Sequence, residues 1–238
     1  MKISLRTSYQ KQYYDKEHNY MDTADTNYVN NLVERLISEA KIKKHHKILE
    51  IGCGKGRFSI PLLKKGYNIT CIDLSDSLLK DFKKNISSEM KVKIINEDFN
   101  KIAKKLKNKF DFIIGFYILH HLDNLEGSFR NMRIMLKKGG KIIFSENNPY
   151  NLMYYVQMMI VKDMGWKGEK GILNMRTGVM LPMLESAGFE DFSIKRYGFL
   201  PPFIVNTKWG LKLDKILEKI GIFYPVLPFQ IITAKRAK

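Results

Sequence analysis

The stretch ILEIGCGKGRF, residues 48–58, places three glycines directly after a short apolar run and before an amphipathic one. Gly52, Gly54 and Gly56 have no side chains, so the backbone can turn sharply there and come close to a ligand that meets free N–H groups at the start of a helix. In the G-x-G-x-x-G fingerprint of dinucleotide sites, the third glycine comes one residue later. Glu50, just before the turn, favours a ligand ammonium over a pyrophosphate. The stretch therefore predicts a strand, a ligand-binding turn and a helix, in that order.

Short apolar runs alternate with amphipathic segments along the rest of the chain, which is typical of β-α-β units and a parallel sheet. Segments 57–65 and 124–138 are each followed by glycine, which ends helices by taking a left-handed conformation. A further helix is expected at 177–187. The predicted strands are 47–52, 68–73, 92–98, 110–116, 141–147, 189–198 and 228–236. We therefore predict an α/β fold with a doubly wound, seven-stranded, mainly parallel sheet and helices on both of its faces.

Acidic side chains stand at the ends of the second and third predicted strands. Asp73 ends the second strand, 21 residues after Gly52 (73 − 52), where a carboxylate can accept hydrogen bonds from both hydroxyls of a ribose. Its alternative role is a helix N-cap, which Ser75 or Asp76 could serve instead. The third strand ends in Asp98 and Phe99, an acid that can accept an adenine amino proton beside a ring that can stack. Three consecutive strand ends thus offer contacts for an amino-acid group, a ribose and an adenine.

Five motifs, in this order along the chain, resemble the successive motifs of class I S-adenosylmethionine-dependent methyltransferases: EIGCGKG, CIDLS, EDF, FDFIIGFYILHHL and LKKGGKIIF. The resemblance covers residues 45–147, and the helix with ESAGF and the last two strands also resemble the C-terminal part of the family. It implies the class I methyltransferase fold, with S-adenosyl-L-methionine as cofactor and S-adenosyl-L-homocysteine as product. The contacts that it implies are Gly52, Cys53 and Gly54 along the methionine part, Glu50 with its ammonium through water, Asp73 with the ribose, Leu74 against the adenine, Asp98 and Phe99 at the adenine edge, and Gly115 with Phe116 near the sulfonium.

Tyr117, His120 and His121 follow the fourth predicted strand and are the candidate catalytic residues. Methyl transfer is an in-line displacement, so the protein aligns the acceptor and removes its proton where needed. Either histidine could be the general base, and the alternative is that one packs under the following helix. In quinone O-methyltransferases this segment resembles E-x-x-E-H and can hold a divalent metal, but here Tyr117 and His120 stand at the positions of the acids, so we expect no metal. The other pair, His45 and His46, has no acid or cysteine at ligand spacing and is interpreted as a solvated loop.

Three segments lie outside the minimal sheet. Residues 1–44 resemble an N-terminal helical cap, and residues 45–238 are expected to form the Rossmann-like methyltransferase domain. Insertions are expected at about 148–176 and 199–227, after strands five and six, beside the edge where substrates approach such a sheet. We expect substrate contacts from three aromatic residues in these segments, Tyr14, Tyr150 and Tyr154.

Both insertions contain an apolar helical pattern. Residues 150–161 are apolar on most faces, which predicts a helix that is buried or binds an apolar partner. In KWGLKLDKILEKIG, residues 208–221, apolar residues recur at helical spacing among lysines. That pattern is typical of an interfacial helix at acidic lipid, and a core-facing helix gives the same pattern.

Charge and cysteine content restrict the partners and the compartment. Lys and Arg total 41 against 24 Asp and Glu, a net charge of +17, which attracts RNA, acidic lipid or a phosphorylated substrate. The two cysteines, Cys53 and Cys71, lie in apolar runs and predict free thiols in a reducing cytoplasm. The N-terminus lacks the apolar run of a secretory signal, and no stretch reaches the roughly 18 apolar residues of a membrane span. We therefore expect a cytoplasmic protein, with peripheral contact to an acidic membrane surface as an option.

The acceptor is the least determined part of the prediction. Family members that methylate amino groups of adenine or glutamine often carry N/D-P-P-Y after strand four, whereas this chain has Gly115, Phe116 and Tyr117 there. We therefore predict O- or C-methylation of a small-molecule or lipid-linked acceptor. The alternatives are an RNA methyltransferase and a non-catalytic S-adenosylmethionine-binding protein.

Overall fold

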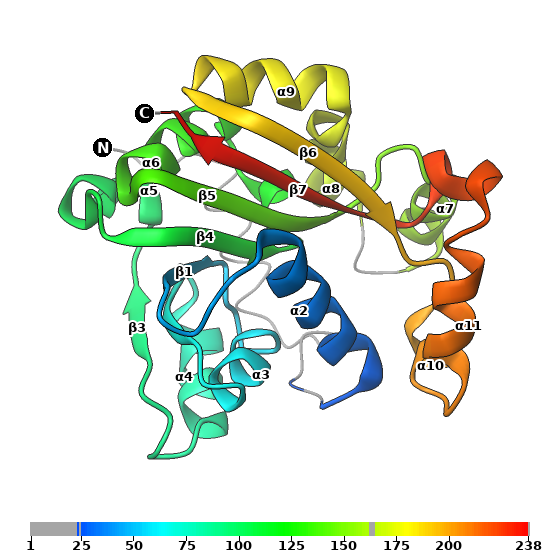
Figure 1. Cartoon of the computed structure of the whole chain (residues 1–238), viewed down its shortest axis with the longest axis horizontal. Helices are drawn as coiled ribbons and strands as arrows, with labels where there is room; N and C mark the ends of the chain where they lie inside the picture. Colours follow the sequence, from blue (N-terminus) through cyan, green and yellow to red (C-terminus); the bar gives the residue numbers. More distant parts are fainter. Residues whose placement is uncertain (1–22, 24, 162–164, 238) are drawn as a thin grey trace.

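The computed structural model describes residues 23, 25–161 and 165–237 (Figure 1). Seven strands form one sheet in the order β3-β2-β1-β4-β5-β7-β6. The first five strands run parallel, and β7 is antiparallel to both β5 and β6. The strands are β1 Lys47–Ile51, β2 Asn68–Asp73, β3 Lys93–Asn96, β4 Phe110–Phe116, β5 Leu136–Asn147, β6 Phe189–Tyr197 and β7 Phe229–Arg236. The predicted doubly wound, seven-stranded, mainly parallel sheet is confirmed.

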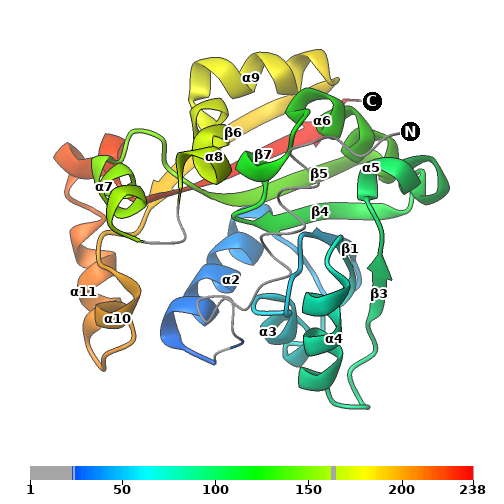
Figure 2. The ribbon, with the colours of Figure 1, turned by 180° about the vertical axis from the view of Figure 1, so that it is seen from behind.

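Helices cover both faces of this sheet. The helices of the described residues are α2 Asn27–Ala40, α3 Ser59–Lys64, α4 Asp76–Asn85, α5 Phe99–Ile102, α6 Leu125–Met135, α7 Leu152–Ile160, α8 Trp166–Glu169, α9 Thr177–Ser186, α10 Pro202–Val205 and α11 Gly210–Leu217. Four short 3₁₀ segments are η2 Ala103–Leu106, η3 Leu119–His121, η4 Lys170–Met175 and η5 Gly221–Val226. The helices α2, α3 and α4 pack on one face of the sheet, and α6 and α9 pack on the other (Figure 2).

The alternation of apolar side chains along the strands and helices accounts for the two cores. On one face, the α2 residues Leu32 and Leu36 pack with Ile48 of β1. On the other face, Phe129 of α6 packs with Leu49, the next residue of β1. Because successive residues of a strand point to opposite faces, a strand buried on both sides needs an unbroken apolar run, as β1 has.

The boundary between α6 and β5 differs from the expectation. The sequence predicted a helix over 124–138 that ends at two glycines, but α6 ends at Met135 and β5 begins at Leu136. Leu136 pairs with Phe110 of β4 across a register shift, and the Lys137 ammonium bonds the Asp111 carboxylate at 2.7 Å. These contacts with β4 draw the segment into the sheet, so the glycines lie within a long strand.

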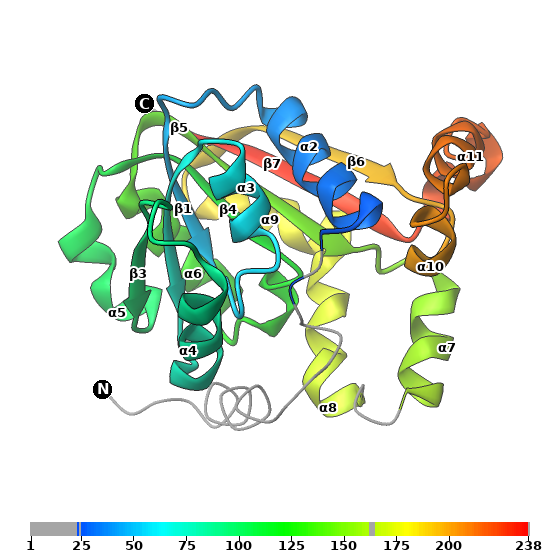
Figure 3. The ribbon, with the colours of Figure 1, turned by 90° about the horizontal axis from the view of Figure 1, so that it is seen from below.

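The two insertions lie at one end of the molecule, where Figure 3 places α7, α10 and α11. The Asn148 side-chain amide donates to the carbonyls of Pro225 and Leu227, at 3.0 and 2.7 Å. Asn151 donates to the carbonyl of Val226 and caps α7 by accepting from the Tyr154 amide at 3.1 Å. Amides at the start of α7 therefore tie the first insertion to η5 of the second.

The apolar pattern of both insertion helices has an unexpected outcome. Leu152 and Met159 of α7 are 72% and 79% exposed, so only the side of α7 that carries Tyr154 is buried. Beside α11, Trp209 is 78% exposed, and Ile216 within it is 54% exposed, so the core-facing alternative for 208–221 is wrong. Among the described residues, no helix combines the length and apolar character that a membrane span requires. The division into an N-terminal cap and a domain stays a prediction.

Candidate cofactor site and histidine cluster

The glycine turn follows β1 at the carboxyl edge of the sheet, beside the point where strand order reverses between β1 and β4. Gly52, Gly54 and Gly56 have φ angles of 73°, 50° and 84°, in the left-handed region that favours glycine. A Cβ on Gly56 would lie 2.3 Å from the Phe82 ring, and one on Gly52 would lie 2.7 Å from the Ile118 side chain. Both conformation and close packing therefore require glycine in this turn.

Asp73 joins the end of β2 to the glycine turn. One carboxylate oxygen accepts from the Gly54 amide at 2.8 Å, and the other accepts from the Ser75 amide at 2.9 Å. Ser75 caps α4 through its hydroxyl, which accepts from the Leu78 amide at 3.2 Å. Asp73 is therefore not the helix cap. Each carboxylate oxygen can accept more than one hydrogen bond, so these two amide contacts do not exclude ligand hydroxyls.

Glu50 lies beneath the turn and is only 1% exposed. The Ser59 hydroxyl donates to its carboxylate at 2.7 Å. Burial raises the pKa of Glu50 to about 8, and the nearby Asp73 charge adds to the rise while the Ser59 hydrogen bond opposes it. At neutral pH this carboxyl therefore carries a proton, and an arriving ammonium would favour its ionised form.

Beyond the end of β3, Asp98 and Phe99 already have partners within the protein, whereas the sequence predicted that both contact the adenine. Asp98 caps α5, since its carboxylate accepts from the Asn100 amide at 2.9 Å. Phe99 is 6% exposed and packs in the core, and Leu74 is half-buried. The Asn96 amide, which the sequence analysis missed, donates to the carbonyls of Asp73 and Leu74 at 3.1 Å each. The adenine contacts of Leu74, Asp98 and Phe99 stay predictions.

The buried cysteine of the turn belongs to the core. Cys53 is 5% exposed, and neither Cys53 nor Cys71 is in a disulfide. Burial raises the pKa of the Cys53 thiol well above its usual value. Its predicted place along the cofactor therefore rests on its backbone, which stands between Gly52 and Gly54.

The loop after β4 closes over the glycine turn through Ile118, which the sequence analysis missed. A Cβ on Gly115 would lie 2.7 Å from Ile118, the residue that also fills the space beside Gly52. The Phe116 ring stacks on Phe58, with ring centroids 4.1 Å apart. Tyr117 has a φ of 56°, and its hydroxyl lies 2.8 Å from the Tyr28 hydroxyl of α2. This loop is therefore held by packing on both sides.

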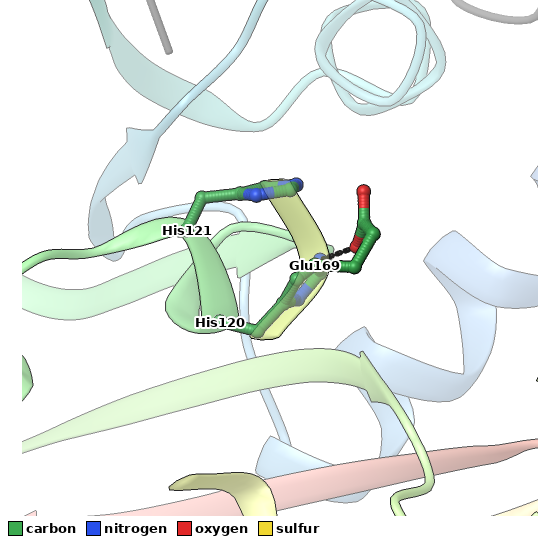
Figure 4. A group of neighbouring side chains, drawn as sticks. All are labelled: His120, His121 and Glu169. Carbon is green, nitrogen blue, oxygen red and sulfur yellow. Dashed lines mark ion pairs between the residues drawn. The ribbon is translucent and has the colours of Figure 1, made fainter. Parts of the chain in front are cut away.

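His120 stands at the centre of a buried polar cluster and is 2% exposed (Figure 4). Its Nδ1 lies 2.5 Å from the Glu146 carboxylate, and its Nε2 lies 3.2 Å from Glu169. Burial alone lowers the pKa of His120, but the two carboxylates outweigh it and raise the pKa to about 10. A histidine held between two carboxylates cannot act as a free general base at neutral pH.

The neighbours of His120 define the rest of the cluster. The second Glu146 oxygen accepts from the amides of Ile118 and Leu119, at 2.8 and 2.7 Å, so this carboxylate fixes the loop. The Tyr154 hydroxyl donates to Glu169 at 2.6 Å. His121 is partly exposed, and its ring centroid lies 3.9 Å from that of His120. The structure thus brings together His120, His121 and Tyr154, which the sequence analysis singled out, with two acids that it missed.

A sequence signal existed for only one of those acids. Glu146 is a charged residue in an apolar strand, KIIFSEN, and burial of such a residue requires a partner. Glu169 lies in the first insertion and has no pattern that separates it from a solvated acid. Its approach to His120 depends on how the insertion folds back.

The remaining candidate residues lie apart from this cluster. Tyr150 is 42% exposed, and the Arg196 guanidinium lies 5.4 Å from its ring centroid. Tyr14 lies outside the described residues. The His46 Nδ1 accepts from the Lys43 amide at 2.9 Å, and His45 is exposed. The substrate contacts of the three tyrosines stay predictions.

Comparison with known proteins identifies the segment that carries this site. A family model described as a methyltransferase domain matches residues 49–144. The malonyl-[acyl-carrier protein] O-methyltransferase 2 of Ilyobacter polytropus is 37% identical over 100 residues, 41% of this chain and 38% of that protein. The ubiquinone biosynthesis O-methyltransferase of Coxiella burnetii is 32% identical over 106 residues, 44% of this chain and 45% of that protein. The matches thus span less than half the length of these two relatives.

A solved structure extends the likeness to most of the fold. The phosphoethanolamine N-methyltransferase 2 of Haemonchus contortus, in complex with S-adenosyl-L-methionine, superposes with a TM-score of 0.65. The superposition covers 87% of this chain and 53% of that one, at 14% identity, which supports the fold alone. The matched segment, residues 49–144, is also the part of the sheet that carries the glycine turn, so this segment is similar to a methyltransferase domain and the chain has the fold of class I S-adenosylmethionine-dependent methyltransferases.

Proposed function

We propose that this protein transfers the methyl group of S-adenosylmethionine to an oxygen or carbon atom of a small-molecule or lipid-linked acceptor. The observation that carries the proposal is that the glycine turn, Asp73 and Glu50 lie together at one edge of the sheet. The two curated relatives are named as O-methyltransferases, which supports oxygen as the acceptor atom.

The side chains at this edge fit the cofactor. Asp73 is fixed by the amides of Gly54 and Ser75, so it presents an oriented carboxylate to the ribose hydroxyls. Glu50 lies close enough to the turn to respond to the cofactor ammonium. S-adenosylmethionine supplies the activated methyl group, and the chain contributes binding and alignment. Cys53, Leu74, Asp98, Phe99, Gly115 and Phe116 complete the proposed set of cofactor contacts.

The loop 117–121 would present the acceptor to the methyl group. Ile118 packs against Gly52 and Gly115, so this loop adjoins the glycine turn directly. Of its three candidate catalytic residues, Tyr117 is hydrogen-bonded to Tyr28, and His120 is held between two carboxylates. His121 is the partly exposed one, which favours it as the group that meets the acceptor.

The apolar end of the molecule supports an acceptor held in a lipid surface. We use "apolar end" for the exposed apolar side chains of α7, α10, α11 and η5 and of Trp209, which precedes α11; among them are Leu152, Met159, Ile160, Phe203, Trp209 and Ile222. These side chains are between 72% and 81% exposed. Many large apolar side chains exposed at one end of a molecule favour an interaction site there.

The acidic side chains of the second insertion bind partners inside the protein, so its apolar and basic side chains face solvent. The Asp214 carboxylate accepts from the amides of Phe199 and Leu200 at 2.8 and 2.7 Å, and it is 3% exposed. Glu218 pairs with Arg35 of α2 at 2.6 Å. The four lysines of this segment, Lys208, Lys212, Lys215 and Lys219, are all exposed. Apolar side chains among exposed lysines complement the surface of a membrane that contains anionic lipids.

A labelled-methyl assay tests the reaction. The full chain is incubated with methyl-labelled S-adenosylmethionine and fractionated cell extract, and label is followed into lipid, small-metabolite, RNA and protein pools. We expect label in the lipid or small-metabolite pool. Label confined to RNA would replace the acceptor class with the nucleic-acid alternative, and binding of the cofactor without label in any pool would support the non-catalytic one.

A vesicle co-sedimentation assay tests the membrane contact. We expect binding to phosphatidylcholine vesicles that contain phosphatidylglycerol, and little binding to phosphatidylcholine alone. A double variant, Lys212→Glu with Lys215→Glu, should lose at least about 2 kcal/mol, or about 30-fold in partitioning. The matched control is Lys104→Glu with Lys105→Glu, which makes the same charge change at exposed lysines of η2. Equal losses of vesicle binding in both double variants would mean that binding depends only on the net charge of the protein, which would contradict the assignment to the apolar end.

A further inference from the structure

We propose that His120, His121 and Glu169 bind a divalent transition-metal ion, with Glu146 as the outer carboxylate that orients His120. The candidate ligand atoms of the three residues all lie within 4.8 Å of one another. Figure 4 shows both imidazoles and the carboxylate directed toward a common point. His120 and Glu169 are buried and His121 is partly exposed, so the group has one side toward the protein and one toward solvent.

The contact between Glu146 and His120 is of the kind that metal-ligating histidines make. Such histidines almost always donate their second ring N–H to a carboxylate or carbonyl, which fixes the tautomer and aims the other nitrogen. Here Nδ1 lies 2.5 Å from Glu146, and Glu146 is itself fixed by the amides of Ile118 and Leu119. The His120 Nε2 is thereby aimed at Glu169, 3.2 Å away.

The Glu169 carboxylate is positioned in turn by Tyr154 of α7, whose hydroxyl donates to it at 2.6 Å. Two buried carboxylates, Glu146 and Glu169, then flank one histidine. Buried charges in proteins are paired or coordinate metals, and a divalent ion neutralises two carboxylates. Glu169 of the first insertion thus supplies the carboxylate that the loop after β4 lacks. The spacing of Tyr117, His120 and His121 could not indicate this contribution.

The ligand set selects the kind of metal. Two imidazoles and one carboxylate are the donors of catalytic zinc sites with three protein ligands, and imidazole also suits iron, nickel and copper, whereas magnesium and calcium prefer oxygen. Three protein ligands leave a position for water on the side of the partly exposed His121. If the proposed function holds, that position would take the acceptor oxygen.

Zinc titration of the full chain tests the site. The protein is stripped with EDTA and titrated calorimetrically with Zn²⁺, and Co²⁺ serves as a probe by visible absorption. We expect one site per chain. His121→Gln should weaken Zn²⁺ binding on the order of 100-fold or more, and Glu146→Gln should weaken it about 10- to 100-fold as outer-carboxylate changes do.

The control is His45→Gln, since His45 belongs to the other adjacent histidine pair and is exposed. Wild-type affinity in this variant together with a loss in His121→Gln supports the site. Unchanged Zn²⁺ affinity in His121→Gln, or no Zn²⁺ binding by the wild type, overturns it. Because His121 is partly exposed, this variant should fold, and its melting temperature without metal checks that. The readout is metal binding, so failure of methyl transfer would leave this result intact.

Discussion

The glycine-turn edge and the apolar end of this molecule use the same residue types in opposite ways. At the glycine turn, apolar side chains such as Leu49 and Ile51 are buried, whereas Asp73 at the end of β2 is partly exposed. At the apolar end, Asp214 is buried, while Trp209 and Ile216 face solvent. The difference shows that helical periodicity identifies the two sides of a helix without deciding which side faces the protein.

The reason lies in the partners available to each segment. The β1 segment meets two neighbouring strands and helices on both faces, so burial of its apolar side chains provides the largest stabilisation. The α11 segment meets backbone amides at 199–200 and Arg35 of α2, and these are better satisfied by carboxylates than by leucine or isoleucine. The apolar side of α11 is therefore left exposed.

The largest effect is expected at the loop that adjoins the glycine turn. If His121 acts at the acceptor as proposed, His121→Ala should lower turnover on the identified acceptor on the order of 100-fold or more. The affinity for S-adenosylmethionine should not change. His45→Ala provides the control in the same rate assay. Full activity of His121→Ala would remove the loop from the chemistry.

Asp73→Ala should weaken S-adenosylmethionine binding by roughly 1.5 to 3 kcal/mol, or about 10- to 150-fold, through loss of hydrogen bonds to a charged group. Calorimetric titration with the cofactor measures this. Asp111→Ala is a matched control, since Asp111 also accepts a backbone amide, that of Lys47 at 2.7 Å, but at the start of β1. An unchanged affinity in Asp73→Ala would break the assignment of this edge to the cofactor.

Asp214→Ala tests the other region. The amides of Phe199 and Leu200 would lose their acceptor, so the free energy of unfolding should fall by about 1 to 3 kcal/mol. Denaturant unfolding measures the loss. The affinity of the folded variant for S-adenosylmethionine should match wild type, because α11 is remote from the glycine turn. A large loss of cofactor affinity would mean that the two regions are coupled.

The smallest effect concerns a single proton on Glu50. Its pKa of about 8 in the folded protein exceeds the ordinary value of 4.5, so the folded chain holds a proton that the unfolded chain releases between these values. The free energy of unfolding contributed by Glu50 therefore falls as pH rises through this window. Binding of the cofactor ammonium at pH 7 should release up to one proton, measured by calorimetry in buffers of different ionisation enthalpy. Glu50→Gln should abolish the release, and a release that persists in this variant would assign the proton elsewhere.

Much of the cofactor side could be predicted because it depends on local patterns. The glycine turn, Asp73 at the end of β2 and the cap of α4 are set by residues a few positions apart. Asp98 was expected at a strand end, but β3 ends at Asn96 and Asp98 caps α5. The start of β5 was missed, because Leu136 joins the sheet through Phe110 and Lys137 through Asp111. These partners are distant in sequence, and no periodicity of 124–138 indicates them.

The sequence by itself determined most of the sheet, the glycine turn and the resemblance to methyltransferases, since the periods of strands and helices and the conformational freedom of glycine act within short segments. Only the tertiary structure decided which acids face His120 and which side of α11 faces outward. Glu146 and Glu169 lie on separate elements, and their approach to one imidazole depends on how β5 and the first insertion pack. Electrostatic and hydrogen-bonding partners are chosen by distance in space, which the local sequence does not encode.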